Sequence, residues 1–336
     1  MSEVLRFLLS LLPVFIFLLI LIILDSYKLV KFSAVLTAII VGAVVALGCL
    51  WLNSWILQTL RLSMISYSRY LAPLVEETGK ALFLFYLFRS SKIGFMVDAA
   101  ILGFAIGAGF AFVENIYYLR SIAETNMLLW IVRGFGTAIM HGSTTAIFGI
   151  IAKNFQERKK EGMLQMGLPA LFCAYAIHSI FNHFILPPIL TTLTLLLSLP
   201  VLMIFIFDLS EHSLQKWLGV GFDTDMALLQ MIDTGKVSET RVGQYLLSLK
   251  TRFPGEVVAD MLCLLKLHLE LSLRAKGVLM MRETGFRISQ DPEIKAKFEE
   301  MKYLEKSIGK TGKLAILPFL HTSSHDLWQL YMLGKK

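Results

Sequence analysis

Long apolar runs separated by short polar stretches dominate the first 207 residues of the chain. A membrane-spanning helix needs about 20 mainly apolar residues, and seven stretches reach or approach this length. They cover residues 7–24, 33–52, 70–88, 95–119, 127–152, 163–186 and 189–207. The pattern predicts an all-α polytopic membrane protein with about seven transmembrane helices.

The segment between the second and third predicted spans has a weaker, amphipathic pattern. Ile56, Leu57, Leu60, Met64 and Tyr67 recur near helical spacing, with polar residues between them. A helix with one apolar and one polar face lies in the plane of the membrane interface. We therefore predict an interfacial helix over residues 53–69 rather than another span.

The last part of the chain has the composition of a water-soluble protein. About a quarter of residues 208–336 are charged, and amphipathic patterns replace the long apolar runs. Four helical stretches begin near Asp223, Ser238, Pro254 and Asp291. The pattern predicts a transmembrane domain over residues 1–207, followed by a soluble helical C-terminal domain over residues 208–336.

Overall composition limits the kinds of partner. The chain is 56% hydrophobic with a formal net charge of +7, but no basic stripe is interleaved with aromatic residues, so we expect no nucleic-acid partner. The three cysteines have neither metal-binding nor disulfide spacing. His321 and His325 are four residues apart without an acidic partner at a fixed offset, and we interpret them as surface histidines. The lipid bilayer is therefore the first expected partner.

Loop lysine and arginine residues indicate the orientation, because they are more frequent on the cytoplasmic side of a membrane. With the N-terminus outside, eight fall in inner loops, namely Lys28, Lys31, Arg89, Lys92, Lys153, Arg158, Lys159 and Lys160. Five fall on the outer side, namely Arg6, Arg61, Arg69, Arg120 and Arg133. We therefore predict an outer N-terminus and a cytoplasmic C-terminal domain.

Polar and ionisable residues occur inside four of the predicted spans, although one charged group at the centre of a membrane helix costs at least about 2.5 kcal/mol. Those that recur at one depth are Glu76, Glu77, Glu114, His141, His178 and Asn182. Neighbouring spans run in opposite directions, so all six fall in the same half of the membrane. A functional site explains this agreement in depth better than separate structural polar groups do.

These residue types can hydrolyse an amide bond. A carboxylate with a histidine can take a proton from water and deliver it, and a second histidine with an asparagine amide can stabilise an oxyanion. The predicted catalytic residues are Glu76, Glu77, Glu114, His141, His178 and Asn182. Lys80, four residues after Glu76 and on the same helix face, and Asn115 are predicted to support the charge.

A metal-dependent mechanism stays open beside direct activation of water. Zinc or another divalent metal can be held by histidine and carboxylate groups with one position open for water. In that case Glu77, Glu114, His141 and His178 are the predicted ligands. Asparagine is an unusual zinc ligand, so the presence of Asn182 favours direct activation.

Short motifs follow one another on consecutive spans. "EETGK" at 76–80 fits EExxK, "FAFVE" at 110–114 fits FxxxE and precedes Asn115, His141 lies in the next span, and "HSIFN" at 178–182 fits HxxxN. In this order they resemble the PrsW family of bacterial intramembrane proteases, which is distantly related to the CAAX-prenyl endopeptidases. The resemblance covers roughly residues 70–186. Relatives with EExxxR and FxxxH motifs have a histidine where this chain has Glu114.

The resemblance implies hydrolysis of a peptide bond in a membrane-protein substrate, in the bacterial cytoplasmic membrane. It implies Glu76 or Glu77 as the base, and His178 and Asn182 as oxyanion donors. The PrsW family is associated with site-1 cleavage of a membrane-bound anti-sigma factor on the outer side. The outer placement of the site that the loop charges predict agrees with this.

Two other classes of function are weighed against the protease. A proton- or ion-coupled transporter would use the glutamates and histidines as a relay, but these residues cluster at one depth, and paired halves with interrupted helices are not seen in the sequence. A catalytically inactive scaffold predicts that Glu76 and Glu77 can be neutralised without effect. The intramembrane protease explains the ordered motifs best.

Overall fold

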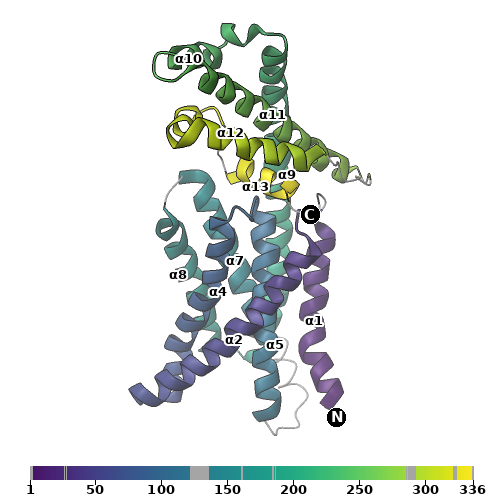
Figure 1. Cartoon of the computed structure of the whole chain (residues 1–336). Coiled ribbons are helices and arrows are strands. Elements are labelled where there is room, and N and C mark those ends of the chain that lie inside the picture. Colours follow the sequence, from purple (N-terminus) through teal and green to yellow (C-terminus); the bar gives the residue numbers. More distant parts are fainter. Residues whose placement is uncertain are drawn as a thin grey trace. The chain divides into compact units, whose positions relative to one another are not determined.

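The structure is a computed structural model that describes residues 3–25, 27, 29–121, 136–159, 162–183, 185, 187–284, 286, 293–320 and 324–334. The helices up to residue 182 are α1 (Glu3–Leu24), α2 (Phe32–Leu60), α3 (Met64–Ser66), the π-helical turn η1 (Tyr67–Leu71), α4 (Ala72–Arg89), α5 (Met96–Ser121), α7 (Thr137–Lys159) and α8 (Met163–Asn182) (Figure 1). They are followed by α9 (Pro188–Asp233), the 3₁₀ turn η3 (Lys236–Glu239), α10 (Arg241–Leu249), α11 (Gly255–Glu283), α12 (Glu293–Ile316) and α13 (Ser324–Gly334). No strand occurs in the described ranges, which confirms the predicted all-α fold for them.

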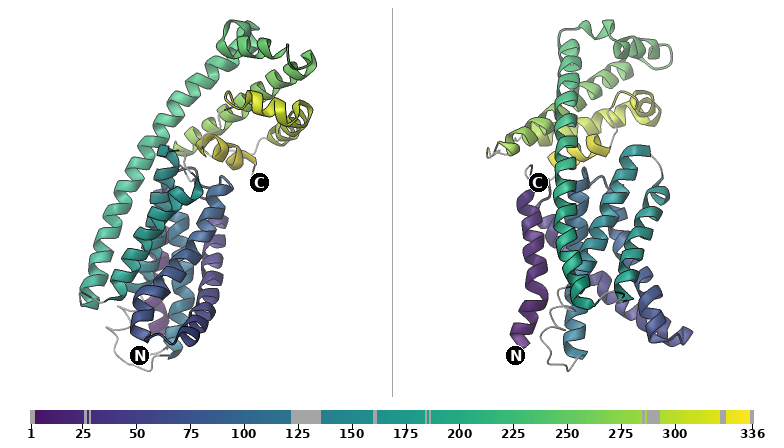
Figure 2. Two further views of the ribbon diagram at one scale, coloured as in Figure 1. Left: turned by 90° about the vertical axis from the view of Figure 1, so that its left-hand side faces the viewer. Right: turned by 180° about the vertical axis from the view of Figure 1, so that it is seen from behind.

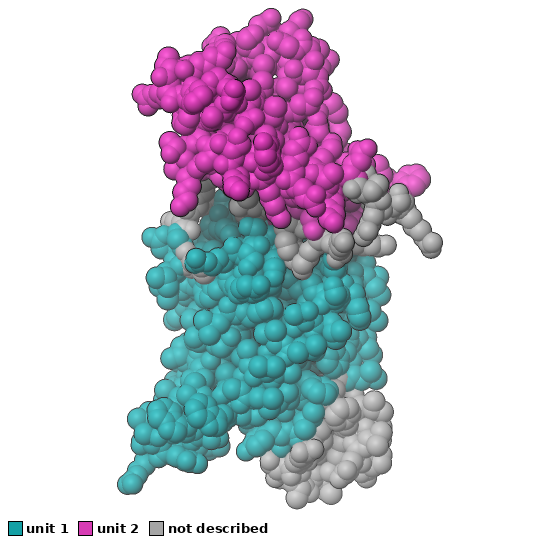
Figure 3. Space-filling view, in the orientation of Figure 1, with its two compact units in different colours: residues 1–210 teal, residues 211–336 magenta. Residues whose placement is uncertain are grey.

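The chain divides into two compact units, Met1–Ser210 and Glu211–Lys336 (Figure 3). Each unit has its own hydrophobic core, one formed largely by α5 and its neighbours and the other largely by α11. The boundary between the units falls inside α9, close to the predicted boundary after residue 207. What each unit does stays a prediction.

Helix α5 is the most buried helix of the first unit and packs against α1, α2 and α7. Every side chain from Met96 to Ala111 is buried. A Cβ atom at Gly107 would overlap the backbone of His141, and one at Gly103 would overlap that of Thr145. These two glycines therefore let α5 and α7 approach closely, as small residues do between membrane helices.

Among the residues that the structure describes, four helices are long and apolar enough to cross a membrane. Their apolar parts are Phe32–Leu60, Met96–Tyr118, Leu164–Asn182 and Ile189–Asp233. The chain is therefore a multi-pass membrane protein. In α1 the apolar stretch with described side chains is the shorter Val14–Leu24, and α4 and α7 contain ionisable residues. The arrangement with seven spans stays a prediction.

The predicted interfacial helix over residues 53–69 is wrong as a separate element. Helix α2 continues through its first half and ends at Arg61, which has a left-handed backbone with φ 49°. From Met64 a second helix runs through α3 and η1 directly into α4. Apolar residues near helical spacing can extend two neighbouring helices as well as form one of their own.

Helix α9 corrects a second prediction, the helix start near Asp223. Figure 2 shows α9 as one continuous helix, and Asp223 lies inside it. The composition changes after Phe207, but the residues that follow are mostly compatible with a helix, whatever solvent surrounds them. The change in composition therefore marks a change of surroundings without a break in secondary structure.

The remaining helix starts in the second unit lie near their predicted positions. Thr240, rather than Ser238, caps α10, because its hydroxyl accepts a hydrogen bond from the backbone N–H of Gly243 at 3.0 Å. Pro254 directly precedes α11, as predicted. His325, predicted as a surface histidine, is half-buried, and its ring lies 5.8 Å from that of Trp217.

A polar network is buried in the core of the second unit. Asp225 of α9 accepts hydrogen bonds from Ser272 at 2.5 Å and from Lys276 at 2.7 Å, both on α11. The side-chain amide of Gln329, on α13, donates to Ser272 at 3.0 Å. The Lys276 ammonium lies 5.2 Å from the centre of the Trp217 ring. The network thus joins three helices of this unit.

Some sequence predictions concern residues that lie outside the described ranges. They include the start of the span 127–152 with Arg133, the loop residues Lys28 and Lys160, the helix start near Asp291, and His321.

Candidate metal centre and active site

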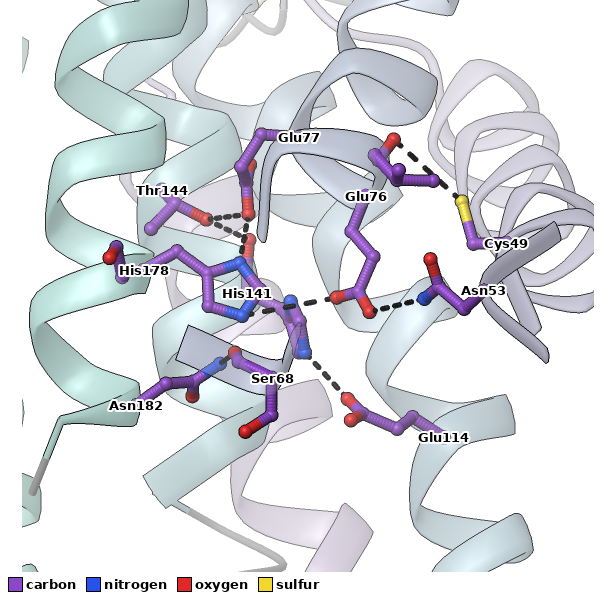
Figure 4. A network of polar contacts seen from close by, with 12 residues as sticks. Cys49, Asn53, Ser68, Glu76, Glu77, Glu114, His141, Thr144, His178 and Asn182 are labelled. Carbon is purple, nitrogen blue, oxygen red and sulfur yellow. Dashed lines mark hydrogen bonds and ion pairs between the residues drawn. The ribbon is translucent and has the colours of Figure 1, made fainter. Parts of the chain in front are cut away.

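Side chains from four helices of the first unit meet in one polar network (Figure 4). Helix α4 contributes Glu76, Glu77 and Lys80, α5 contributes Glu114, α7 contributes His141 and Thr144, and α8 contributes His178. Five of the six predicted catalytic residues therefore lie together, and Asn182 contacts a different group. Asn115 follows Glu114 on α5 and is buried.

Glu77 is the centre of this network. Its Oε1 atom accepts hydrogen bonds from Lys80 Nζ at 2.6 Å, from His178 Nδ1 at 2.7 Å and from the Thr144 hydroxyl at 3.2 Å. The Glu77 side chain is 1% exposed and that of Lys80 is 0% exposed. A buried charge needs such partners, because an uncompensated one is strongly destabilising. Glu77 is therefore a fixed acceptor that orients the His178 ring.

Lys80 pairs with Glu77, three residues before it, whereas the sequence spacing placed it on the face of Glu76. Both spacings bring side chains together on a helix, and the neighbouring helices decide between them. The Lys80 ammonium also lies 3.0 Å from His141 Nδ1 and 4.9 Å from the centre of the Phe110 ring. These contacts hold Lys80 on the side of Glu77.

His141 links Lys80 to a second carboxylate. An ammonium group has only hydrogen-bond donors, so His141 Nδ1 accepts from Lys80. His141 Nε2 lies 2.6 Å from Glu114 Oε2, and the proton between these two atoms is one that a metal ion bound at Nε2 would displace. The Glu114 side chain is 16% exposed, which makes it more accessible than Glu77.

Three of these groups could hold a metal ion. One ligand atom from each of Glu76, His141 and His178 lies within 4.8 Å of the others. His178 directs Nδ1 to Glu77 and has Nε2 3.9 Å from Glu76 Oε2. Because Glu77 accepts the proton on Nδ1, the lone pair of Nε2 faces Glu76. A carboxylate that fixes a histidine in this way is the usual second shell of a metal site.

The residues that come together differ from the predicted ligand set. Glu76, rather than the predicted Glu77, supplies the carboxylate ligand atom. Glu77 Oε1 already accepts three hydrogen bonds, which keep it away from the ligand group. Glu114 lies against His141 instead of joining the three ligand atoms. Two imidazoles and one carboxylate form a donor set typical of catalytic zinc sites, so the residues present fit a divalent metal.

Glu76 is held by two residues that the sequence did not identify. Asn53 of α2 donates its amide to Glu76 Oε1 at 3.0 Å, and the hydroxyl of Tyr67 donates to Asn53 Oδ1 at 2.8 Å. Tyr67 is buried. Asn53 is 23 residues from Glu76, so no helical spacing relates them. The sequence pattern assigned Asn53 and Tyr67 to an interfacial helix, so their role in holding Glu76 was not predicted.

Asn182 and Ser179 hold the backbone just before the site. Pro73 has no N–H group, so it cannot bond to the carbonyls four and five residues before it, those of Arg69 and Ser68. The Asn182 amide donates to the Ser68 carbonyl at 2.8 Å, and the Ser179 hydroxyl donates to that of Arg69 at 2.7 Å. Asn182 therefore positions the π turn that precedes α4.

The chain was compared with known protein families, curated proteins and solved structures. The model of a family described as PrsW family intramembrane metalloprotease matches residues 27–209. This range contains every residue of the network described above. Searches among curated proteins and among solved structures found no match.

Proposed function

The chain belongs to the PrsW family of intramembrane metalloproteases, and on this premise we propose that it is a metal-dependent endopeptidase whose ion is held by Glu76, His141 and His178. One observation carries the proposal: ligand atoms from α4, α7 and α8 lie within 4.8 Å of one another. Zinc suits two imidazoles and a carboxylate. When bound, such an ion polarises a peptide carbonyl and lowers the pKa of a bound water.

The remaining residues orient the ligands and handle protons. Glu77, fixed by Lys80 and Thr144, holds His178 so that Nε2 faces the site. Glu77 is fully engaged and enclosed, so it does not serve as the base. We assign that role to Glu114, which is partly exposed and contacts His141. Glu114 takes a proton from the attacking water and returns it to the leaving amide nitrogen.

Oxyanion stabilisation by His178 and Asn182 was predicted from the sequence. The Asn182 amide donates to the Ser68 carbonyl, which supports a positioning role instead. A metal ion held by Glu76, His141 and His178 would supply the positive charge that stabilises the oxyanion.

The proposed substrate is a membrane protein cleaved in the outer half of the bacterial cytoplasmic membrane. Helices α1, α4 and α7 complete seven spans together with α2, α5, α8 and the first part of α9. The loop charges support an outer N-terminus and a cytoplasmic C-terminal domain, and site-1-type cleavage is compatible with that orientation.

The proposal is tested by metal content and cleavage together. The wild-type protein and the variants His178→Ala, Glu76→Gln and His183→Ala are purified and analysed for bound metal. His183, which directly follows α8, is the matched control, because it contacts Ser179 and Tyr70 rather than the network. We expect about one ion per chain in wild type and His183→Ala, and its loss in the other two.

Cleavage is followed without knowing the substrate, by comparing new protein N-termini in membranes of strains carrying each variant. Products that are present with wild type and His183→Ala, and absent with His178→Ala and Glu76→Gln, support the proposal. If metal-free protein still produces these N-termini, the metal-dependent mechanism is wrong, although the protein is still a protease.

A further inference from the structure

An apolar groove lies between α2 and α4 in the first unit. It has a volume of about 460 Å³. It is lined by Val45, Gly48, Cys49 and Leu52 of α2 and by Leu74, Val75, Thr78, Gly79 and Leu82 of α4. None of these side chains takes part in the network around Glu77. The volume lies within the range of sites that hold small ligands or parts of larger ones.

Two glycines line the groove in different ways. A Cβ at Gly79 of α4 would lie 3.0 Å from Val45 and 3.2 Å from Cys49, so this glycine lets α2 and α4 pack closely. No atom lies within 4 Å of a Cβ built at Gly48 of α2, so the groove is open beside this glycine. Small residues at a membrane helix surface let another helix backbone approach closely. By contrast, Val44 and Trp51 of α2 are bulky and are 61% and 72% exposed, as expected of an ordinary lipid-facing surface.

The groove leads to the residues that hold Glu76. The Cys49 thiol donates to the carbonyl of Val75 at 3.9 Å, and Val75 directly precedes Glu76. One helical turn beyond Cys49, Asn53 donates to Glu76, as Figure 4 shows. The Glu76 side chain is 12% exposed. Two lining residues, Leu52 and Val75, directly precede Asn53 and Glu76 in the chain, so the groove adjoins the residues of this hydrogen bond.

We propose that this groove docks the apolar transmembrane helix of the substrate. The inference rests on the proposed function, and it adds where a membrane substrate binds and how it reaches Glu76. The helix packs against the open wall that contains Gly48, and its polar end continues past Asn53 toward the candidate metal centre. A lipid chain would not need the close backbone approach that Gly48 permits.

Disulfide crosslinking in vesicles tests this docking. The probe is a synthetic helix of about 20 leucine and alanine residues with lysine ends and one central cysteine. Thr78→Cys places a thiol in the groove, and Val44→Cys is the control on the lipid-facing side of α2. Both are made with the native cysteines replaced by alanine. We expect at least about tenfold more crosslinking at position 78 than at position 44.

A second variant fills the groove. Gly48→Leu, in the Thr78→Cys background, is expected to lower crosslinking about tenfold through overpacking, whereas Val44→Leu leaves it unchanged. Metal content is measured in each variant, so that failure of the metal centre is seen separately from failure of docking. Equal crosslinking at positions 78 and 44, or labelling of the groove by a photoreactive phosphatidylcholine but not by the helix, overturns the proposal.

Discussion

Both units contain a buried lysine paired with a carboxylate beside an aromatic ring. In the first unit Lys80 lies 2.6 Å from Glu77 and near Phe110. In the second unit Lys276 lies 2.7 Å from Asp225 and near Trp217. The pairs are nearly equal in distance and burial, so a buried ion pair alone does not identify a site.

The groups that surround each pair are what differ. Asp225 accepts from Ser272, which in turn accepts from Gln329, and both of these residues are neutral and buried. The network around Glu77 contains two histidines and two more glutamates, three of which bring ligand atoms within 4.8 Å of one another. In the part of the chain that the structure describes, no such group includes Asp225. We therefore interpret one pair as part of a reactive site and the other as structural.

Removing the carboxylate of the structural pair gives the largest expected effect. Asp225→Leu leaves Lys276 buried without a counter-charge, and we expect a loss of about 3–5 kcal/mol in the free energy of unfolding of the second unit. Asp225→Leu with Lys276→Met should recover most of it, because an apolar pair of similar volume replaces a buried ion pair well. Denaturant unfolding measures both, and a double variant as unstable as the single one would contradict the structural interpretation.

The corresponding substitutions of Glu77 and Lys80 in the first unit should change stability and metal affinity by different amounts. Glu77→Gln removes the carboxylate that orients His178, and we expect metal affinity to fall about 10–100-fold, as for other second-shell changes. Glu77→Leu with Lys80→Met should restore stability but not metal affinity. Competition with a chelator measures the affinity. Full metal affinity in the double variant would make this pair structural too.

A smaller effect is expected from Thr144, which donates to Glu77. Thr144→Val keeps the shape and removes the hydroxyl, which lies 3.2 Å from both Glu77 Oε1 and the His141 carbonyl. The hydrogen bond to Glu77 is worth about 1 kcal/mol, so metal affinity should fall about fivefold. Thr145→Val is the control, because Thr145 donates to the His141 carbonyl at 2.9 Å and not to Glu77. Equal losses in the two variants would show that α7 packing, rather than the Glu77 contact, is responsible.

The smallest effect is expected two contacts away from the ligand atoms. Tyr67→Phe frees Asn53 and loosens Glu76 only indirectly, so we expect about a twofold loss of metal affinity, at the lower end for a single hydrogen bond. Tyr70→Phe is matched to it within the same π turn, since Tyr70 contacts His183 instead. Equal losses of metal affinity in Tyr70→Phe and Tyr67→Phe, measured by chelator titration, would show that the Tyr67–Asn53 contact does not help to hold Glu76.

Much of the network could be predicted because depth in a membrane is readable from sequence. Alternating spans placed Glu76, Glu114, His141 and His178 in one half of the bilayer, and the structure brings them together. The choice between Glu76 and Glu77 as the partner of Lys80 was not readable, since both spacings fit one helix face. It depends on contacts from α7 and α8.

Contacts between distant segments explain what the sequence did not predict. Asn53 and Tyr67 lie on separate helices, and a hydrogen bond between them leaves no periodic pattern. The continuation of α9 past Phe207 was missed for another reason. Composition reports the surroundings of a helix, whereas its backbone hydrogen bonds continue as long as each residue tolerates helical geometry.

The π turn at Tyr67–Leu71 gives this stretch of the gene an unusual genetic tolerance. A π turn accommodates one residue more than the α-helix around it, so loss of a single codon within the turn would close it to an α-helix and leave Glu76 and Glu77 on their face. Inside α4 there is no extra residue to lose, and one residue corresponds to about 100° of rotation, since a turn contains about 3.6. The reading frame therefore tolerates a missing codon before Ala72 and not after it, where the loss would yield a full-sized, apolar product without a site.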